Sequence, residues 1–177
     1  DRVLVAYATK YGATADIAEK IGQVLHEAGL PADVLPAHRV GDISAYDAVV
    51  LGSAVYIGRW RKEAAKFLKA NVEDMAQKPV WLFSSGPTGE GDPVELTQGW
   101  RFPGSLQELA DQIQPRDVAL FHGSVDVDKM SFIEKWMIKN VKSPAGDFRD
   151  WDAISAWAAA IATELQGMGP APATASD

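Results

Sequence analysis

The sequence lacks cysteine, which excludes disulfide bonds, thiolate catalysis, iron–sulfur clusters and cysteine-based zinc sites. Its three histidines, His26, His38 and His122, show no metal-ligand spacing, so we predict no metal site. It also lacks any apolar run approaching the roughly 20 residues that a membrane-spanning helix needs. In the absence of such signals, we expect a cytoplasmic protein.

Positive charge is scarce, because the sequence has 17 Lys and Arg but 24 Asp and Glu, which gives a formal net charge of −7. This balance argues against a nucleic-acid partner, since nucleic-acid binding relies on basic surface. Two nucleotide-binding fingerprints, GxGxxG after a strand and GxxxxGK[ST], are also missing. The first predicted strand ends without an acidic pair, which disfavours a phosphorylated receiver domain.

Short apolar runs alternate with amphipathic stretches along the chain. Strands are predicted at residues 3–8, 32–37, 48–51, 80–84 and 118–121, and helices at residues 17–28, 62–70, 106–113 and 154–165. This alternation predicts an α/β fold, a doubly wound five-stranded parallel sheet with helices on both faces. We expect one domain over residues 1–166, with an extra segment after the fifth strand, and a flexible tail at 167–177.

Ligands of doubly wound sheets bind beyond the carboxyl ends of the strands, where the strand order reverses. The loops at these ends are rich in small and hydroxyl residues. After the first, third and fourth strands they contain Thr9, Lys10, Tyr11, Gly12, Ala13 and Thr14; Ser53, Ala54, Val55, Tyr56, Ile57 and Gly58; and Ser84, Ser85, Gly86 and Pro87. The first loop predicts an anion site at a helix start, with an ordinary capped turn as the alternative. A flat ring could lie between the other two loops.

With these loops in register, the sequence resembles the flavodoxin family. Thr9, Gly12 and Thr14 match the family's T/S-x-T-G-x-T phosphate loop, in which Tyr11 replaces the usual hydroxyl residue. The resemblance implies the strand order 2-1-3-4-5. It also implies that the first loop binds the phosphate of FMN and that the other two loops flank its isoalloxazine ring.

Residues 46–68, 132–141 and 150–158 further resemble the menaquinone-dependent protoporphyrinogen oxidases, flavodoxin-like enzymes of heme biosynthesis. This resemblance implies an FMN-dependent oxidoreductase that passes electrons from a porphyrinogen through flavin to a quinone. The alternative is a plain electron-transfer flavodoxin that serves as a carrier between redox protein partners. No side chain stands out as a general acid or base, so no catalytic residue is assigned.

Aromatic residues near these loops have two interpretations. Tyr56 and Trp60 are placed to stack on the flavin or border it, with packing under the next helix as the alternative. Trp100 could cover the site or pack on the surface. His122, near the end of the fifth strand, is predicted to be structural.

Two basic stretches stand out in this acidic chain. Residues 129–142 carry a net charge of +3 beside an apolar face with Met and Trp, against −10 for the rest of the chain. They predict a helix that docks on the inner face of a membrane or on an apolar redox partner, or else packs on the domain with its lysines in water. Arg59, Arg61 and Lys62 could pair with substrate carboxylates, or could serve only solubility.

Overall fold

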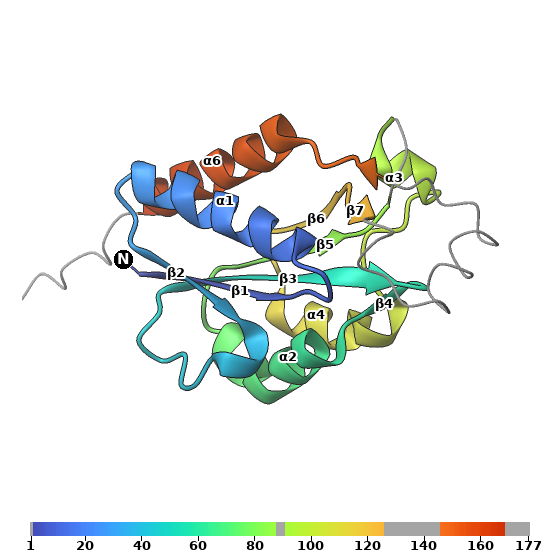
Figure 1. Cartoon of the computed structure of the whole chain (residues 1–177). Helices are drawn as coiled ribbons and strands as arrows, with labels where there is room; N and C mark the ends of the chain where they lie inside the picture. The colour runs from blue at the N-terminus through green and yellow to red at the C-terminus, as the bar shows by residue number, and fades with distance from the viewer. Residues whose placement is uncertain (1, 88–90, 126–145, 169–177) are drawn as a thin grey trace, which may run out of the picture.

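The computed structural model describes residues 2–87, 91–125 and 146–168, and its centre is a parallel sheet (Figure 1). The strands are β1 (Val3–Ala8), β2 (Ala32–Pro36), β3 (Ala48–Tyr56), β5 (Val80–Ser85) and β6 (Asp117–Phe121). They lie in the order β2-β1-β3-β5-β6, and a short strand, β4 (Arg59–Trp60), pairs antiparallel with β3. Without β4 this order is the predicted 2-1-3-4-5, so the fold prediction is confirmed.

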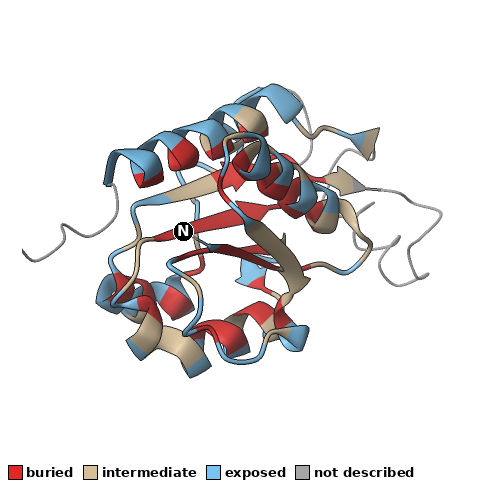
Figure 2. Cartoon of the chain, turned by 90° about the vertical axis from the view of Figure 1, so that its left-hand side faces the viewer, coloured by how far each residue is buried: buried red, intermediate tan, exposed pale blue. Residues whose placement is uncertain are grey.

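Helices cover both faces of the sheet. Helices α1 (Ala13–Glu27) and α6 (Trp151–Met168) lie on one face, and α2 (Lys62–Met75) and α4 (Gln107–Ile113) lie on the other (Figure 1). Val3 and Val5 pack into the core under α1 and α6, whereas Leu4 and Ala6 pack into the core over α2 and α4. Figure 2 shows the strands as the buried centre of the molecule. A strand buried on both faces is apolar at every position, which explains the unbroken apolar run.

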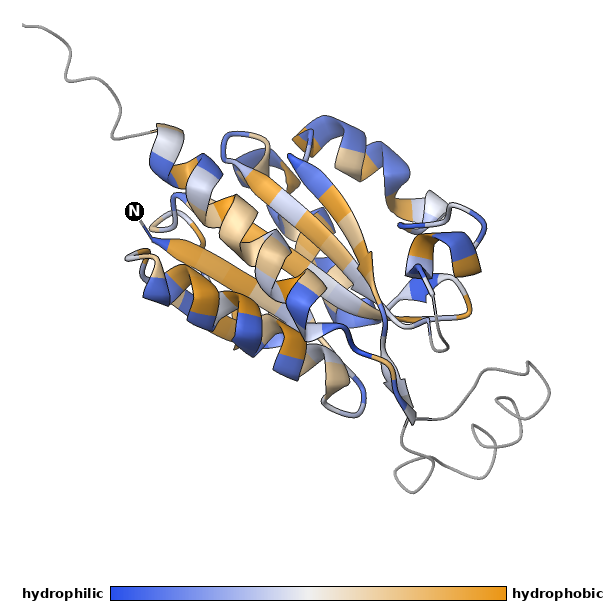
Figure 3. Ribbon diagram, turned by 90° about the horizontal axis from the view of Figure 1, so that it is seen from above, coloured by the Kyte–Doolittle hydropathy of each residue, from blue (hydrophilic) through white to orange (hydrophobic). Residues whose placement is uncertain are grey.

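The long helices have recognisable ends and one apolar side each. Helix α1 begins after Gly12, whose φ is 93°, and the chain turns away from its other end at Gly29, whose φ is 88°. Helix α6 is capped by Asp150, whose carboxylate accepts a hydrogen bond from the Ala153 N–H at 3.0 Å. Figure 3 shows these helices with mixed hydrophobic and hydrophilic sides above orange, hydrophobic strands.

The third strand differs from its predicted bounds of residues 48–51. Strand β3 continues to Tyr56 because it pairs with β1 as far as Ser53 and with β5 as far as Ala54. It then turns into β4, with Tyr56 opposite Arg59. Most of the stretch predicted as a loop is therefore a β3–β4 hairpin.

Several shorter elements complete the described chain: η1 (Ala37–Arg39), α3 (Pro93–Leu96), η2 (Gly104–Leu106), β7 (Ser124–Val125) and β8 (Gly146–Asp147). Strands β7 and β8 pair antiparallel. The predicted helix at 129–142 lies between them in sequence and outside the described residues. Helix α6 includes the first two residues of the predicted tail, and the rest of the tail also lies outside them. No helix in the described ranges is long and apolar enough to cross a membrane.

Candidate functional site

The sheet register brings the three predicted loops together. Ser53 of β3 is paired with Ala8 at the end of β1 on one side and with Ser84 of β5 on the other. Ala54 is paired with Ser85. The loop after β1, the β3–β4 hairpin and the loop after β5 therefore leave the same edge of the sheet side by side, at the point where the strand order reverses.

The loop after β1 forms a compact turn into α1. The Gly12 N–H donates to the Thr9 hydroxyl at 3.0 Å, and the left-handed φ of Gly12 lets α1 begin at Ala13. The next three N–H groups, those of Ala13, Thr14 and Ala15, have no acceptor among the described residues. They are the positive end of the helix dipole, and a side chain added at Gly12 would meet only open space. These donors fit a phosphate group.

The side chains of this loop differ in their exposure. Thr14 is only 1% exposed, whereas Lys10 is exposed, with its ammonium 5.3 Å from the centre of the Tyr11 ring. An anion at this site would therefore depend mainly on backbone N–H groups and hydroxyls, which bind phosphate without requiring a cation.

Two predicted ligand-binding hydroxyls are buried and make internal hydrogen bonds. The Ser53 hydroxyl accepts from the Arg61 N–H at 2.9 Å and donates to the Ala54 carbonyl at 2.8 Å. The Ser84 hydroxyl accepts from the Trp60 indole N–H at 2.8 Å. Both serine residues have no exposed surface. The Ser84 hydroxyl therefore holds the hairpin against β5, and the Ser53 hydroxyl holds the end of β4 against β3.

Trp60 and Tyr56 have different environments. Trp60 is 7% exposed, and its ring meets Phe102 edge-on with centroids 5.0 Å apart. It is a core residue, so the packing alternative holds for Trp60 rather than a place beside a ring. Tyr56 is 47% exposed at the end of β3, and its place beside a flavin ring stays a prediction.

The turn of the hairpin is strained at Ile57. Ile57 and Gly58 have φ values of 50° and 67°. Two successive residues with positive φ form the two-residue turn whose twist matches that of a hairpin. A β-branched residue rarely adopts a positive φ. Ile57 is also 70% exposed, so an apolar side chain stands at the tip of the candidate site.

The third loop is packed tightly against its neighbours. A Cβ added to Gly86 would lie 3.2 Å from the Val55 carbonyl oxygen, and one added to Gly123 would lie 3.0 Å from Gly86. Ser85 is 2% exposed, and the Gly86 N–H donates to the Phe121 carbonyl at 3.2 Å. A side chain at position 86 would therefore crowd Val55, so the loop after β5 lies close against the β3–β4 hairpin.

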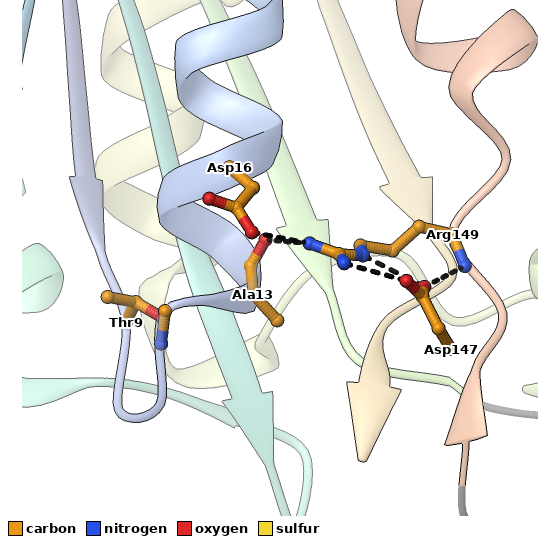
Figure 4. Close-up of polar contacts among 6 residues, drawn as sticks. Thr9, Ala13, Asp16, Asp147 and Arg149 are labelled. Carbon is orange, nitrogen blue, oxygen red and sulfur yellow. Dashed lines mark hydrogen bonds and ion pairs between the residues drawn. The ribbon is translucent and has the colours of Figure 1, made fainter. Parts of the chain in front are cut away.

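A group of charged residues that the motifs did not reveal lies beside the first turn of α1. Arg149, which follows β8, reaches Asp16 of α1 with Nη1 3.0 Å from the carboxylate, and it also holds Asp147 (Figure 4). Hydrogen bonding from the Arg149 side chain holds the pKa of the Asp147 carboxyl below its usual value. Asp16 and Arg149 are 133 residues apart, so no local pattern could have predicted their contact.

The end of β6 is occupied by His122, which is 7% exposed. Its Nδ1 lies 3.1 Å from the Pro87 carbonyl oxygen and its Nε2 lies 2.5 Å from that of Gly91. These contacts tie the loop after β5 to β6, as expected for a structural histidine. A cavity of about 540 Å³ lies beside it, lined by Phe148, Arg149 and Trp151 among others. It includes none of the predicted site residues.

Parallel strands in this order, with a helix that starts directly after the first strand's loop at the reversal point, define a flavodoxin-like fold. The chain belongs to the Flavodoxin domain family, whose model matches residues 4–152. Membership implies flavin binding and supports a role as an electron-transfer flavoprotein.

Individual relatives are distant. The chain is 23% identical over 172 residues to protoporphyrinogen IX dehydrogenase [quinone] of Escherichia coli strain K12, covering 91% of this chain and 94% of that protein. A flavodoxin from the domain Archaea has a TM-score of 0.64 and 16% identity, covering 94% of this chain and 99% of that one. Rubredoxin oxygen:oxidoreductase of Desulfovibrio gigas has the same TM-score and identity, covering 96% of this chain but 37% of that one. These structural likenesses concern the fold.

Proposed function

We propose that this chain is an FMN-dependent oxidoreductase that passes electrons from an organic substrate to a quinone. The observation that carries the proposal is the helix start at the reversal point, where the N–H groups of Ala13, Thr14 and Ala15 have no acceptor in the described part of the chain and lie beside two hydroxyl residues. A phosphate monoester is the group that such a site binds best, because it accepts several hydrogen bonds and carries negative charge.

Each loop would have a separate task. Residues 9–14 hold the phosphate, while the β3–β4 hairpin and residues 85–87 orient the ring. FMN, when bound, supplies the ring that takes up electrons and passes them on, and the protein supplies position, electrostatics and access. Tyr56, exposed on the hairpin, excludes water from one side of the ring.

The substrate class follows from the relative of known activity. The E. coli protein is named for protoporphyrinogen IX and quinone, and this chain matches it over nearly its whole length. Porphyrinogens carry carboxylates, and two basic residues are exposed here, Arg59 on the hairpin and Lys62 at the start of α2. Arg61 lies 3.4 Å from Glu63 through Nε, so it is less available for a substrate. We therefore infer a porphyrinogen as electron donor and a quinone as acceptor.

The second candidate is a carrier flavodoxin with protein partners. The net charge of −7 favours it, because carriers dock on basic partners through complementary charge. Flavodoxins are also prominent among the structural neighbours.

One experiment separates the two candidates. The purified protein is loaded with FMN, and anaerobic oxidation of a porphyrinogen is followed with and without a water-soluble quinone. An oxidoreductase shows repeated quinone-dependent turnover. A carrier shows at most one turnover per flavin until a redox protein that accepts electrons from the reduced flavin is added. Mass spectrometry of the flavin that co-purifies tests the cofactor separately, and the absence of FMN binding would contradict both candidates.

A further inference from the structure

Arg149 connects the segment between β8 and α6 to the first turn of α1. Its Nη1 lies 3.0 Å from the Asp16 carboxylate and 3.3 Å from the Ala13 carbonyl oxygen (Figure 4). Its Nε and Nη2 donate to the two carboxylate oxygens of Asp147 at 2.9 and 2.7 Å. The guanidinium carbon lies 4.9 Å from the centre of the Trp151 ring.

These contacts hold the guanidinium in one orientation. The forked pairing with Asp147 fixes its plane, and the side chain is only 13% exposed. The two carboxylates raise the pKa of Arg149, with hydrogen bonding to Asp147 as the largest cause. The nitrogen that does not contact Asp147, Nη1, donates instead to Asp16 and to the Ala13 carbonyl in the first turn of α1.

The negative charge of Asp16 explains why its ion pair with Arg149 affects the binding of an anion at the start of α1. A carboxylate in the first turn of a helix is favourable when no other anion is present, because it complements the helix dipole. A phosphate group at the same helix end is repelled by that carboxylate. The ion pair with Arg149 offsets the repulsion while leaving the N–H groups unoccupied.

We propose that Arg149 is a positioning residue for the phosphate site, which holds the first turn of α1 in place and offsets the negative charge of Asp16. This inference rests on the proposed function, because it concerns the phosphate of the same flavin. It adds a residue from the far end of the chain to a site otherwise built at the amino-terminal end.

The test compares FMN with riboflavin, which has the same ring but no phosphate. Dissociation constants are measured by quenching of flavin fluorescence in the wild type and in Arg149→Met. We expect a rise of about fivefold for FMN, the upper end of what an exposed charge pair contributes, and no change for riboflavin. The effect should shrink at high salt, since screening weakens the repulsion from Asp16.

A second substitution separates charge from structure. Asp16→Asn in the Arg149→Met background removes the uncompensated carboxylate, so FMN affinity should return toward the wild-type value. Arg149→Lys, which keeps the positive charge, should bind FMN better than Arg149→Met. The matched control is Arg116→Met, because Arg116 makes a similar ion pair with Glu164 at 2.9 Å at the opposite end of β6. Arg116→Met should leave the dissociation constants of FMN and riboflavin unchanged.

The outcomes distinguish this inference from the proposed function. If the wild type binds riboflavin and FMN equally, there is no phosphate site, and the proposed function and the inference on Arg149 are both overturned. If the wild type prefers FMN and Arg149→Met keeps the full preference, only the inference on Arg149 is overturned. Equal losses for both flavins would also overturn it, because a purely structural residue does not discriminate between them.

Discussion

At the scale of single residues, Thr14 is the side chain most closely tied to the phosphate site. It is 1% exposed and sits in the first turn of α1, beside N–H groups that lack an acceptor among the described residues. Thr14→Val keeps the shape and removes the hydroxyl. A hydrogen bond to a charged group contributes about 1.5–3 kcal/mol, so the dissociation constant of FMN should rise roughly 10- to 150-fold. Calorimetric titration checks this, and an unchanged constant would remove Thr14 from the site.

Gly52, which lies in β3 behind the candidate site, shows how tight packing limits the size of the side chain at one position. A Cβ at this position would lie 2.0 Å from the nearest ring atom of Phe83, which is fully buried. Gly52→Ala should lower the free energy of unfolding by about 1–3 kcal/mol or more through overpacking. Urea denaturation measures the change. Gly41→Ala is the matched control, since a Cβ there meets nothing within 4 Å, and an equal loss in both variants would contradict the packing argument.

At the scale of elements, the β3–β4 hairpin combines strain with exposure. Ile57 has a φ of 50° in a turn that favours Asn followed by Gly, and Gly58 already provides the glycine. Ile57→Asn should therefore raise the free energy of unfolding by about 1 kcal/mol. Thermal unfolding of the FMN-free protein tests this. Ile57→Val retains the β-branch and should give no gain, and a similar gain in both variants would show that loss of exposed apolar surface is responsible.

The sequence predicted those elements whose signals are local. Continuous apolar runs identified the central strands, and the Thr9–Thr14 spacing identified the turn into α1. The end of β3 was missed because Gly52, Ser53 and Ala54 carry no strand preference, and pairing with both neighbouring strands forms it instead. The ion pair of Arg149 with Asp16 depends entirely on how distant segments come together.

At the scale of the whole molecule, charge is unevenly distributed along the sequence. Residues 129–142, which lie outside the described residues, carry +3 in a chain of net −7. We predict that the protein co-sediments with anionic lipid vesicles at low salt and is released at high salt. Each lysine near such a surface contributes roughly 1 kcal/mol. The triple variant Lys135→Glu, Lys139→Glu and Lys142→Glu should lose this binding and still bind FMN.

The control for this prediction changes charge equally elsewhere. Lys62, Lys66 and Lys69 are exposed on α2, so replacing all three by Glu alters the net charge by the same amount. That control should still sediment with vesicles. If both triple variants lose vesicle binding, the attraction depends on overall charge and residues 129–142 are not a docking element.

The pairing of β7 with β8 has an evolutionary consequence. Ser124 lies opposite Asp147 and Val125 opposite Gly146, so the two ends of the sequence between these strands are held at adjacent positions. The entropy of closing a loop between such fixed ends grows only with the logarithm of its length, about 0.6 kcal/mol for each doubling. A lineage can therefore lengthen, shorten or exchange the sequence between these strands at little thermodynamic cost. The pairing of β7 with β8 fixes the two ends, and selection can act on the sequence between them without disturbing the sheet.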